Sequence, residues 1–290
     1  MIMKKLFLFV IILLALFVVY ESGTFAKITW NPWSGGKASA GEKISGVDMI
    51  EVDASGVGVT IVPHRGDSVD AELEGKGSVT VQKRGSTIHV DYKRENSFGF
   101  FNFKNNKVTV YVPEDFNENM VLNSGAGNIK FEGKSEKDPF QLEELTLKVG
   151  AGNITLKNIE AGSFVGNIAS GNVRADNLVV GEGKFDLKSG NVNVKQFVGP
   201  LDAKVTSGNF TLEMAEMTGD VSVRVTSGRM DLELPKDADF TLNGKVSSGN
   251  VSVRHPMTVV KETRSEVAGT NGDGMFSVDV QVTSGCMTIR

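Results

Sequence analysis

Apolar and polar residues alternate along most of this chain, in short units that repeat one after another. The stretch 221–225 alternates valine with polar residues before Gly228, and the stretch 230–234 alternates methionine or leucine with acidic residues after it. Alternation with a period of two places the apolar side chains on one face of a strand. Each unit is therefore predicted to be a strand, a tight turn and a second strand.

The predicted turn has its own repeated pattern, a small residue followed by glycine, asparagine and an apolar residue. Glycine adopts positive φ without steric cost, and asparagine is the next most tolerant residue at such positions. The turn asparagines are Asn128, Asn153, Asn172, Asn191, Asn209 and Asn250, and two variants carry Arg229 and Cys286 instead. The turn glycines recur at nearly constant intervals: Gly127, Gly152, Gly171, Gly190, Gly208, Gly228 and Gly249. A longer step then reaches Gly285.

A single unit is too small to fold alone. It offers about five inward apolar residues, worth ~1.5–3 kcal/mol each when buried. Ordering about 19 residues costs ~1–2 kcal/mol per residue in backbone entropy. Stacked units share their apolar faces and hydrogen bonds. The near-constant step favours an all-β, single-chain β-solenoid of parallel stacked coils over a sandwich of antiparallel hairpins.

The solenoid repeats are assigned to residues 114–290, and residues 43–113 fit the repeat less well. The Gly58-Val59 turn suggests an earlier copy of the unit. Six strands are readable there, at residues 49–53, 57–62, 69–73, 78–81, 87–92 and 108–112. We interpret 43–113 as an irregular N-terminal β cap, because terminal repeats are usually atypical. Residues 254–274 are interpreted as a surface loop, and Phe276–Arg290 as the final coil with an uncapped edge.

The first residues of the chain have the pattern of a membrane leader. Lys4 and Lys5 precede a run, Leu6–Tyr20, that is apolar apart from the tyrosine hydroxyl. Residues 1–26 are thus predicted to be an N-terminal helix that acts as a membrane anchor, or a signal peptide cut after Ala26. We favour the anchor. Residues 27–42 are rich in Gly, Ser, Ala, Asn and Pro, a composition typical of a flexible tether.

These features predict a cell-membrane protein with a single N-terminal pass and its C-terminal domain outside the cytoplasm. A cleaved and secreted protein is the alternative. The formal net charge of −4 and the absence of a basic motif argue against a nucleic-acid partner. The lone cysteine, Cys286, excludes an intrachain disulfide.

The Ser-Gly-Asn turns and the leader together resemble a known family. The units at 170–172, 189–191, 207–209 and 248–250 are similar to those of the bacterial "putative adhesin" β-strand-repeat family of unknown function. The resemblance is in particular to the LiaG-type proteins encoded with cell-envelope-stress systems. This resemblance implies a membrane-anchored protein with an extracytoplasmic repeat domain and no assigned reaction.

The turn asparagines have two interpretations. Aligned amides could bind glycan hydroxyls, or each amide could bond the next as a structural turn ladder, which we favour. The three histidines lie in separate segments without metal-ligand spacing, and no nucleophile motif occurs. We therefore expect no catalytic residue, no metal and no cofactor.

A cluster of phenylalanines is the other candidate. Phe98, Phe100, Phe101 and Phe103 lie close together in the sequence and are flanked by basic residues. They could contact a partner or a membrane surface, or plug an open end of the core, which we rate slightly ahead.

Taken together, the sequence predicts a non-enzymatic interaction or scaffold module linked to cell-envelope stress. Its expected partners are the membrane, through the N-terminal helix, and envelope proteins or cell-wall glycans. An adhesin or glycan-binding surface protein is the alternative, and a carbohydrate-active enzyme is a third hypothesis, since long β-solenoids can host such sites.

Overall fold

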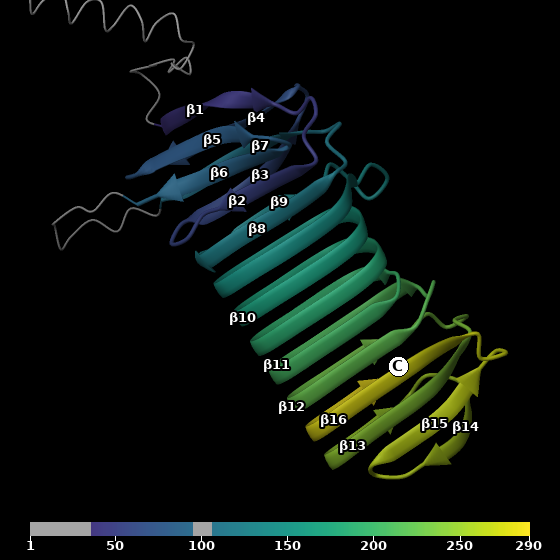
Figure 1. Ribbon diagram of the computed structural model, residues 1–290. Helices are drawn as coiled ribbons and strands as arrows, with labels where there is room; N and C mark the ends of the chain where they lie inside the picture. The colour runs from purple at the N-terminus through teal and green to yellow at the C-terminus, as the bar shows by residue number, and fades with distance from the viewer. Residues whose placement is uncertain (1–35, 95–105) are drawn as a thin grey trace, which may run out of the picture.

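Sixteen strands and no helix make up the part of the chain that the computed structural model describes, residues 36–94 and 106–290 (Figure 1). All sixteen belong to one sheet. The strands are β1 Gly36–Lys43, β2 Met49–Asp53, β3 Gly58–His64, β4 Ser68–Glu74, β5 Ser78–Arg84, β6 Thr87–Lys93, β7 Lys107–Pro113, β8 Asn119–Ala126, β9 Ile129–Glu132, β10 Phe140–Val198, β11 Leu201–Glu216, β12 Val221–Glu233, β13 Phe240–Val253, β14 Thr258–Glu262, β15 Glu266–Asn271 and β16 Phe276–Ile289.

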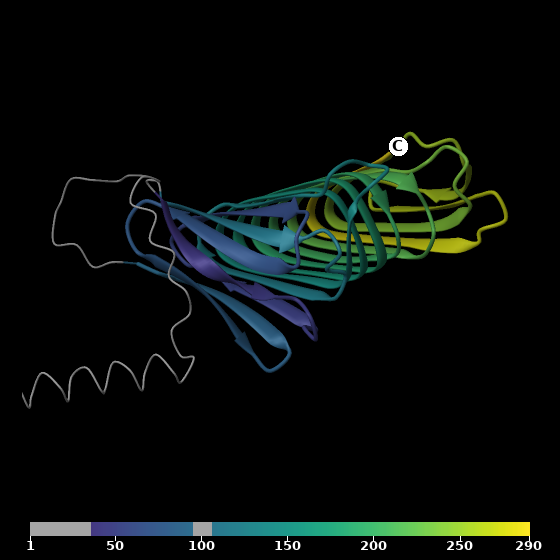
Figure 2. The ribbon, with the colours of Figure 1, turned by 90° about the horizontal axis from the view of Figure 1, so that it is seen from above.

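The middle of the molecule is a solenoid-like stack of parallel coils. β10 continues through 59 residues and pairs in parallel with β8 and β9 on one side and with β11 on the other. Equivalent turns lie over one another, since Gly190 pairs with Gly208 and Gly208 with Gly228. Figure 2 shows these coils nested one behind another along the long axis. The predicted all-β architecture of parallel repeats is present in this region.

The repeated glycines form the first corner of each coil, and the stack leaves room for no other residue there. From Gly127 to Gly285 their φ angles lie between +128° and +152°, a region that L side chains rarely adopt. A Cβ atom on Gly171 would lie 1.9 Å from the carbonyl oxygen of Gly152 in the preceding coil. Close approach of backbones and positive φ together explain the glycine at this corner.

A second corner recurs without glycine. Asn158, Asn177 and Gln196, which are evenly spaced in successive coils, have φ angles of 53°, 55° and 50°. This left-handed conformation suits asparagine better than most side chains. The Asn177 amide also donates to the Asn158 side-chain oxygen at 3.2 Å. No repeated glycine marks this corner in the sequence, so it was not predicted.

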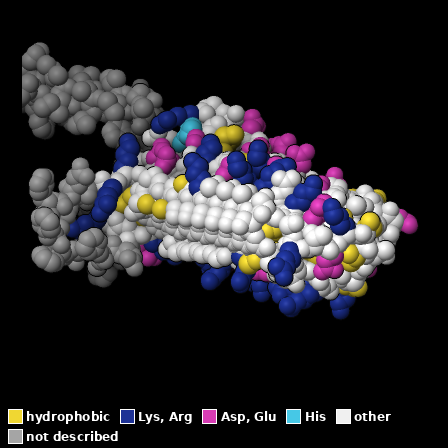
Figure 3. Space-filling model, turned by 90° about the horizontal axis from the view of Figure 1, so that it is seen from below, with side chains coloured by type: hydrophobic (Ala, Val, Ile, Leu, Met, Phe, Trp, Pro, Cys, Tyr) yellow, Lys and Arg dark blue, Asp and Glu magenta, His cyan; other side chains and the backbone are white. Residues whose placement is uncertain are grey.

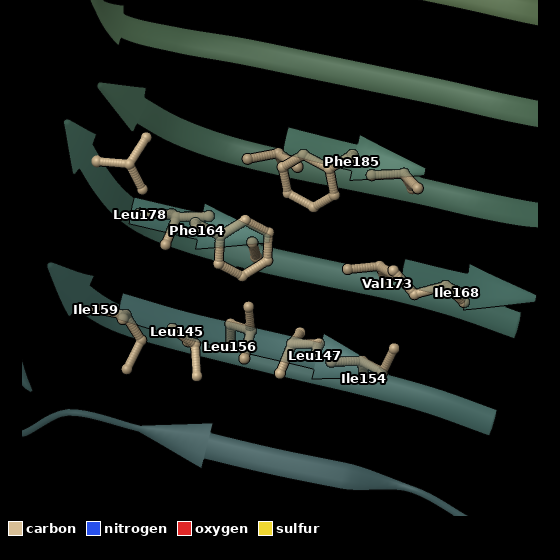
Figure 4. Close-up of a cluster of buried hydrophobic side chains, with 14 of the residues drawn as sticks. Leu145, Leu147, Ile154, Leu156, Ile159, Phe164, Ile168, Val173, Leu178 and Phe185 are labelled. Carbon is tan, nitrogen blue, oxygen red and sulfur yellow. The ribbon is translucent and has the colours of Figure 1, made fainter. Parts of the chain in front are cut away.

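The interior is filled by the apolar rows that the alternation predicts. Phe164, Phe185 and Phe210, from successive coils, are at most 1% exposed. The ring centroids are 4.7 Å apart for the first pair and 6.4 Å for the second. Figure 4 shows Phe164 and Phe185 among leucines, isoleucines and valines that point into the space enclosed by the coils.

At the N-terminal end, the coils do not stack in chain order. β2 and β3 pair in parallel with β8 and β9, so they form the coil next to the main repeats, and the turn before Gly58 is an earlier copy of the corner. β6 and β7 form a further coil outside β2 and β3. β5 pairs antiparallel with β6 and β4 pairs antiparallel with β7, so each half of this coil is covered by a further strand. β1 in turn pairs antiparallel with β4. Gly36–Glu42, the end of the predicted tether, lies in β1.

At the C-terminal end, two expectations are wrong. Phe276–Arg290 does not end the stack, because β16 lies between β12 and β13 and pairs in parallel with both. The expected surface loop 254–274 contains the antiparallel strands β14 and β15, and β15 covers the first half of β13. The terminal coil is therefore β13, and the long step to Gly285 reflects the return of the chain into the stack.

The predicted leader, Met1–Tyr20, lies outside the described residues. Within 36–94 and 106–290, no helical segment has the length and apolar character needed to cross a bilayer.

Candidate functional site

The corner asparagines are linked into a ladder of side-chain amides. Nδ2 of Asn153 donates to Oδ1 of Asn128 at 3.1 Å, and the same bond recurs in the next three steps at 2.9, 2.8 and 2.8 Å. The members of this ladder are Asn128, Asn153, Asn172, Asn191 and Asn209. Each interior amide donates one hydrogen bond to the asparagine before it and accepts one from the asparagine after it. This is the arrangement expected of a structural turn ladder.

The ladder ends where the corner residue changes. Arg229 follows Asn209 in the register, and Cys286 follows Arg229. Nε of Arg229 donates to Sγ of Cys286 at 3.4 Å, and this contact raises the pKa of the guanidinium. Asn250, expected in the same ladder, occupies the next corner beyond Cys286. The insertion of β16 separates it from the other asparagines.

The corner rows produce a surface of uniform polarity. Figure 3 shows a long band without charged or hydrophobic side chains, with lysine and arginine side chains along its margins. Rows of serine, glycine and asparagine are expected to form such a band.

A groove of about 590 Å³ lies beside the corner, on the strands that lead into it. Its floor is formed two positions before each corner, where the side chains are small or absent: Ser55, Gly125, Gly150 and Ala169. A Cβ atom on Gly150 would lie 2.2 Å from the Gly125 carbonyl oxygen, so the coils are in close contact here. Lys188 occupies the same position in the following coil and closes the floor.

Longer polar side chains form one wall of the groove. They lie four positions before each corner, one from each of five successive coils: Asp53, Asn123, Lys148, Asn167 and Asp186. With Lys188, the groove contains two carboxylates, two ammonium groups and two amides. Its formal charge is therefore zero, but its charges are spatially separated.

Most of these side chains are unpaired. In the described part of the chain, Asp53, Lys148, Asn167, Asp186 and Lys188 make no side-chain hydrogen bond or ion pair. The amide nitrogen of Asn123 donates to Glu51 at 2.9 Å, but its buried Oδ1 has no partner.

The strands that follow the corner are different. There Lys157 pairs with Asp176 of the next coil at 3.8 Å, and Arg290 pairs with Glu233 at 3.3 Å. Two ion pairs thus join adjacent coils on that side of the corner, whereas the charged side chains of the groove are unpaired.

The groove was missed by the sequence analysis, although a signal was present. Lys148, Asn167 and Asp186 are evenly spaced in the sequence, and each lies four positions before its corner glycine. A search for polar residues at a fixed offset from the repeated glycine identifies them as one row.

The other sequence candidates are the phenylalanine cluster and the histidines. Phe98, Phe100, Phe101 and Phe103 lie outside the described residues, in the segment that connects β6 to β7. Of the three histidines, His89 approaches Glu51 at 3.2 Å and His255 contacts the Pro235 carbonyl oxygen at 3.0 Å. Within 36–94 and 106–290, no three His, Cys, Asp or Glu side chains are grouped to hold a metal ion.

Comparison with known proteins identifies the fold. A crystal structure of a protein described as a putative adhesin from Bacteroides fragilis NCTC 9343 aligns with a TM-score of 0.52 and 13% identity, over 89% of this chain and 99% of that chain. Another, described as a putative adhesin from Parabacteroides distasonis ATCC 8503, aligns with a TM-score of 0.51 and 12% identity, over 87% and 95% of the two chains. These identities support a shared fold alone.

Comparison with curated proteins gives no match. The model of the Toastrack DUF4097 family, in contrast, matches residues 47–290, which include the groove and every described strand except β1. This chain therefore belongs to the Toastrack DUF4097 family.

Proposed function

We propose that this chain is a membrane-anchored interaction module whose Toastrack stack is displayed outside the cytoplasm. The leader pattern of Met1–Tyr20 supports the anchor and the direction of export. The resemblance to LiaG-type proteins supports a link to the cell-envelope stress response.

The groove beside the corner row gives the most direct structural support for an interaction module. Polar side chains from five coils, most of them unpaired, line one concave surface, and the coils beneath it are fixed by parallel pairing on both sides. Ligands bind preferentially to concave surfaces with a few oriented polar groups. The same rigidity limits the reorganisation needed on binding.

An adhesin or glycan-binding role is the second candidate. Two proteins with the same fold are described as putative adhesins. The amide, carboxylate and ammonium groups of the groove are also suited to hydroxyl-rich ligands. We assign no reaction to the groove.

Cell fractionation and protease treatment test the proposed location. We expect the full-length chain with a C-terminal tag to sediment with membranes, and its tagged domain to be digested when protease is added to intact cells. A Leu13→Lys/Leu14→Lys variant is the control, because each lysine costs ~2.5–3.5 kcal/mol at the centre of a membrane helix. The variant should remain in the cytoplasm, protected from the protease.

A protease-resistant, cytoplasmic wild-type chain would contradict the proposal. Recovery from the medium with a new N-terminus after Ala26 would instead establish the secreted form. Crosslinking in intact cells, followed by purification of the tagged chain, would then identify its envelope partners.

A further inference from the structure

We propose that the unpaired half of the terminal coil, residues 246–253, docks an extended segment of another protein, which adds one more coil to the stack. The docked segment carries glycine opposite Gly249, apolar residues opposite Val251 and Val253, and an acidic residue opposite Arg254. This edge shares no residue with the groove and is a second surface of the proposed interaction module.

The terminal coil is covered over its first half only. β13 pairs with β16 along both of its halves. On its outer side, β15 pairs with residues 240–245 alone, and Figure 1 shows β15 and β14 beside β13 at this end of the stack. Within 36–94 and 106–290, no strand pairs with the outer side of residues 247–253. An unpaired strand edge of this kind is a template for a further strand.

The interior beneath the uncovered half is less protected than in the other coils. Val251 is 9% exposed, whereas Met230 and Met287, at the equivalent position of the two preceding coils, are at most 1% exposed. Val253 is only partly buried, whereas Ile289, opposite it in β16, is fully buried. Apolar residues of an added segment would cover these two valines and gain from the apolar area they bury.

The corner of the added segment must be glycine. A Cβ atom on Gly285 would overlap the carbonyl oxygen of Gly228, and one on Gly249 would overlap the carbonyl oxygen of Gly285. Each corner carbonyl oxygen therefore points toward the coil that follows it in the stack. By the same repeat, the carbonyl oxygen of Gly249 points out of the stack, toward the corner of an added coil. Only a residue without a Cβ atom fits there.

Arg254 indicates the charge that the segment carries. Arg290, at the equivalent position of β16, pairs with Glu233 of the coil on its inner side at 3.3 Å. Arg254 is exposed, and its side chain makes no hydrogen bond or ion pair with the described residues. An acidic residue in the added segment would form with Arg254 the same kind of pair that joins Glu233 to Arg290.

A second copy of this chain does not fit the edge. Its other glycine corners are paired on both sides, so only its own residues 246–253 could serve. Two such edges facing one another would bring together two outward carbonyl oxygens of Gly249. In the symmetric register centred on the corner, they would also place Lys245 opposite Arg254. Like charges directly opposite one another are destabilising.

A synthetic peptide with the sequence of residues 205–213 is the probe. In register with the edge, its Gly208 lies opposite the corner glycine of β13, and its Glu213 lies opposite Arg254. The two apolar residues that follow its corner then lie over the partly exposed valines. The peptide thus meets each of the three requirements.

Disulfide capture detects the docking even when it is weak. The full-length Asn250→Cys/Cys286→Ser chain has one thiol, at the terminal corner, and the peptide carries cysteine in place of Asn209 as a mixed disulfide with thionitrobenzoate. Equivalent positions of adjacent coils have Cα atoms ~4.8 Å apart, which a disulfide spans. We expect release of thionitrobenzoate to be roughly tenfold faster, or more, with this peptide than with its Gly208→Ala form.

Charge reversal and an interior thiol are the controls. Arg254→Glu should slow capture roughly tenfold, and a Glu213→Lys peptide should restore the rate, which a general loss of structure would not allow. The Asn209→Cys/Cys286→Ser chain carries its thiol at an interior corner that is paired on both sides. It should react slowly and at equal rates with the glycine and alanine peptides.

Equal capture of the two peptides at the terminal corner, or an unchanged rate for Arg254→Glu, would overturn the inference. A disulfide-linked dimer of the Asn250→Cys/Cys286→Ser chain that forms as fast as the peptide adduct would show that a second copy occupies the edge, and would overturn it too. None of these outcomes bears on export, which fractionation and protease treatment test independently.

Discussion

Replacing Gly171 with alanine is expected to destabilise the stack by roughly 4 kcal/mol or more. The φ angle of +145° alone costs ~1–3 kcal/mol for a residue with a side chain. The added Cβ would also lie 1.9 Å from the Gly152 carbonyl oxygen, and a backbone atom of a neighbouring coil cannot move aside without displacing its own coil. Changes above 4–5 kcal/mol are exceptional and require such a specific cause.

Thermal unfolding followed by circular dichroism measures this effect. For a domain of this size, ~1 kcal/mol corresponds to ~2–4 °C, so we expect the melting temperature to fall by roughly 8 °C or more, or the variant to fail to fold. Gly85→Ala is the matched control, because Gly85 has a φ of +62° and nothing lies within 4 Å of an added Cβ. It should cost only ~1–2 kcal/mol. Equal losses for the two variants would show that contact between coils does not determine the corner residue.

Phe185→Ala is expected to give the second large loss, about 3–5 kcal/mol. Phe185 is 1% exposed, and its ring contacts Phe164 in the preceding coil and Phe210 in the following one. The residues at the equivalent position in the two adjacent coils are Gly166 and Ala203. Both are too small to fill the space that the ring would leave. The substitution therefore creates a cavity that cannot easily collapse.

Urea unfolding of Phe185→Ala and Phe185→Leu provides the measurement. Leucine retains much of the apolar volume and should cost less than ~2 kcal/mol. Similar losses for both variants, or a loss below ~1 kcal/mol for alanine, would show that the coils do not pack tightly around this ring.

The repeating part of the fold could be predicted from the sequence because its causes are local. Glycine at a fixed interval marks a corner with positive φ, and alternation beside Gly228 marks strands with one buried face. The near-constant interval then distinguishes parallel stacking from hairpins. All six strands expected between residues 49 and 113 are present as well.

The order of the coils could not be predicted in the same way. Parallel coils with equivalent corners form similar contacts in any order, so periodicity does not show that β16 lies between β12 and β13. The second corner was missed for a different reason. Asn158 and Gln196 adopt positive φ without glycine, and asparagine or glutamine in a strand-rich segment is a weak signal for such a conformation.

The groove could be predicted only after the register was known. In the sequence, Lys148 and Asp186 are ordinary charged residues at outward strand positions. Each could equally have formed an ion pair with an opposite charge in a neighbouring coil. The structure shows that the side chains four positions before the corner line a concave surface, because most residues two positions before the corner are small.

Disulfide formation tests the stacking order, on which both the fold and the groove depend. Side chains at equivalent positions of adjacent coils have Cα atoms ~4.8 Å apart, within the range that a disulfide spans, whereas those two coils apart are too distant. Arg229 and Cys286 occupy adjacent corners, and Asn250 lies one corner further.

We expect Arg229→Cys to form an intramolecular disulfide with Cys286 under mild oxidation, detected by mass spectrometry of the non-reduced peptides. Arg229→Cys/Asn250→Cys/Cys286→Ser should form none. The opposite outcome, a disulfide between positions 229 and 250 and none with Cys286, would place the coils in chain order and contradict the stack described above.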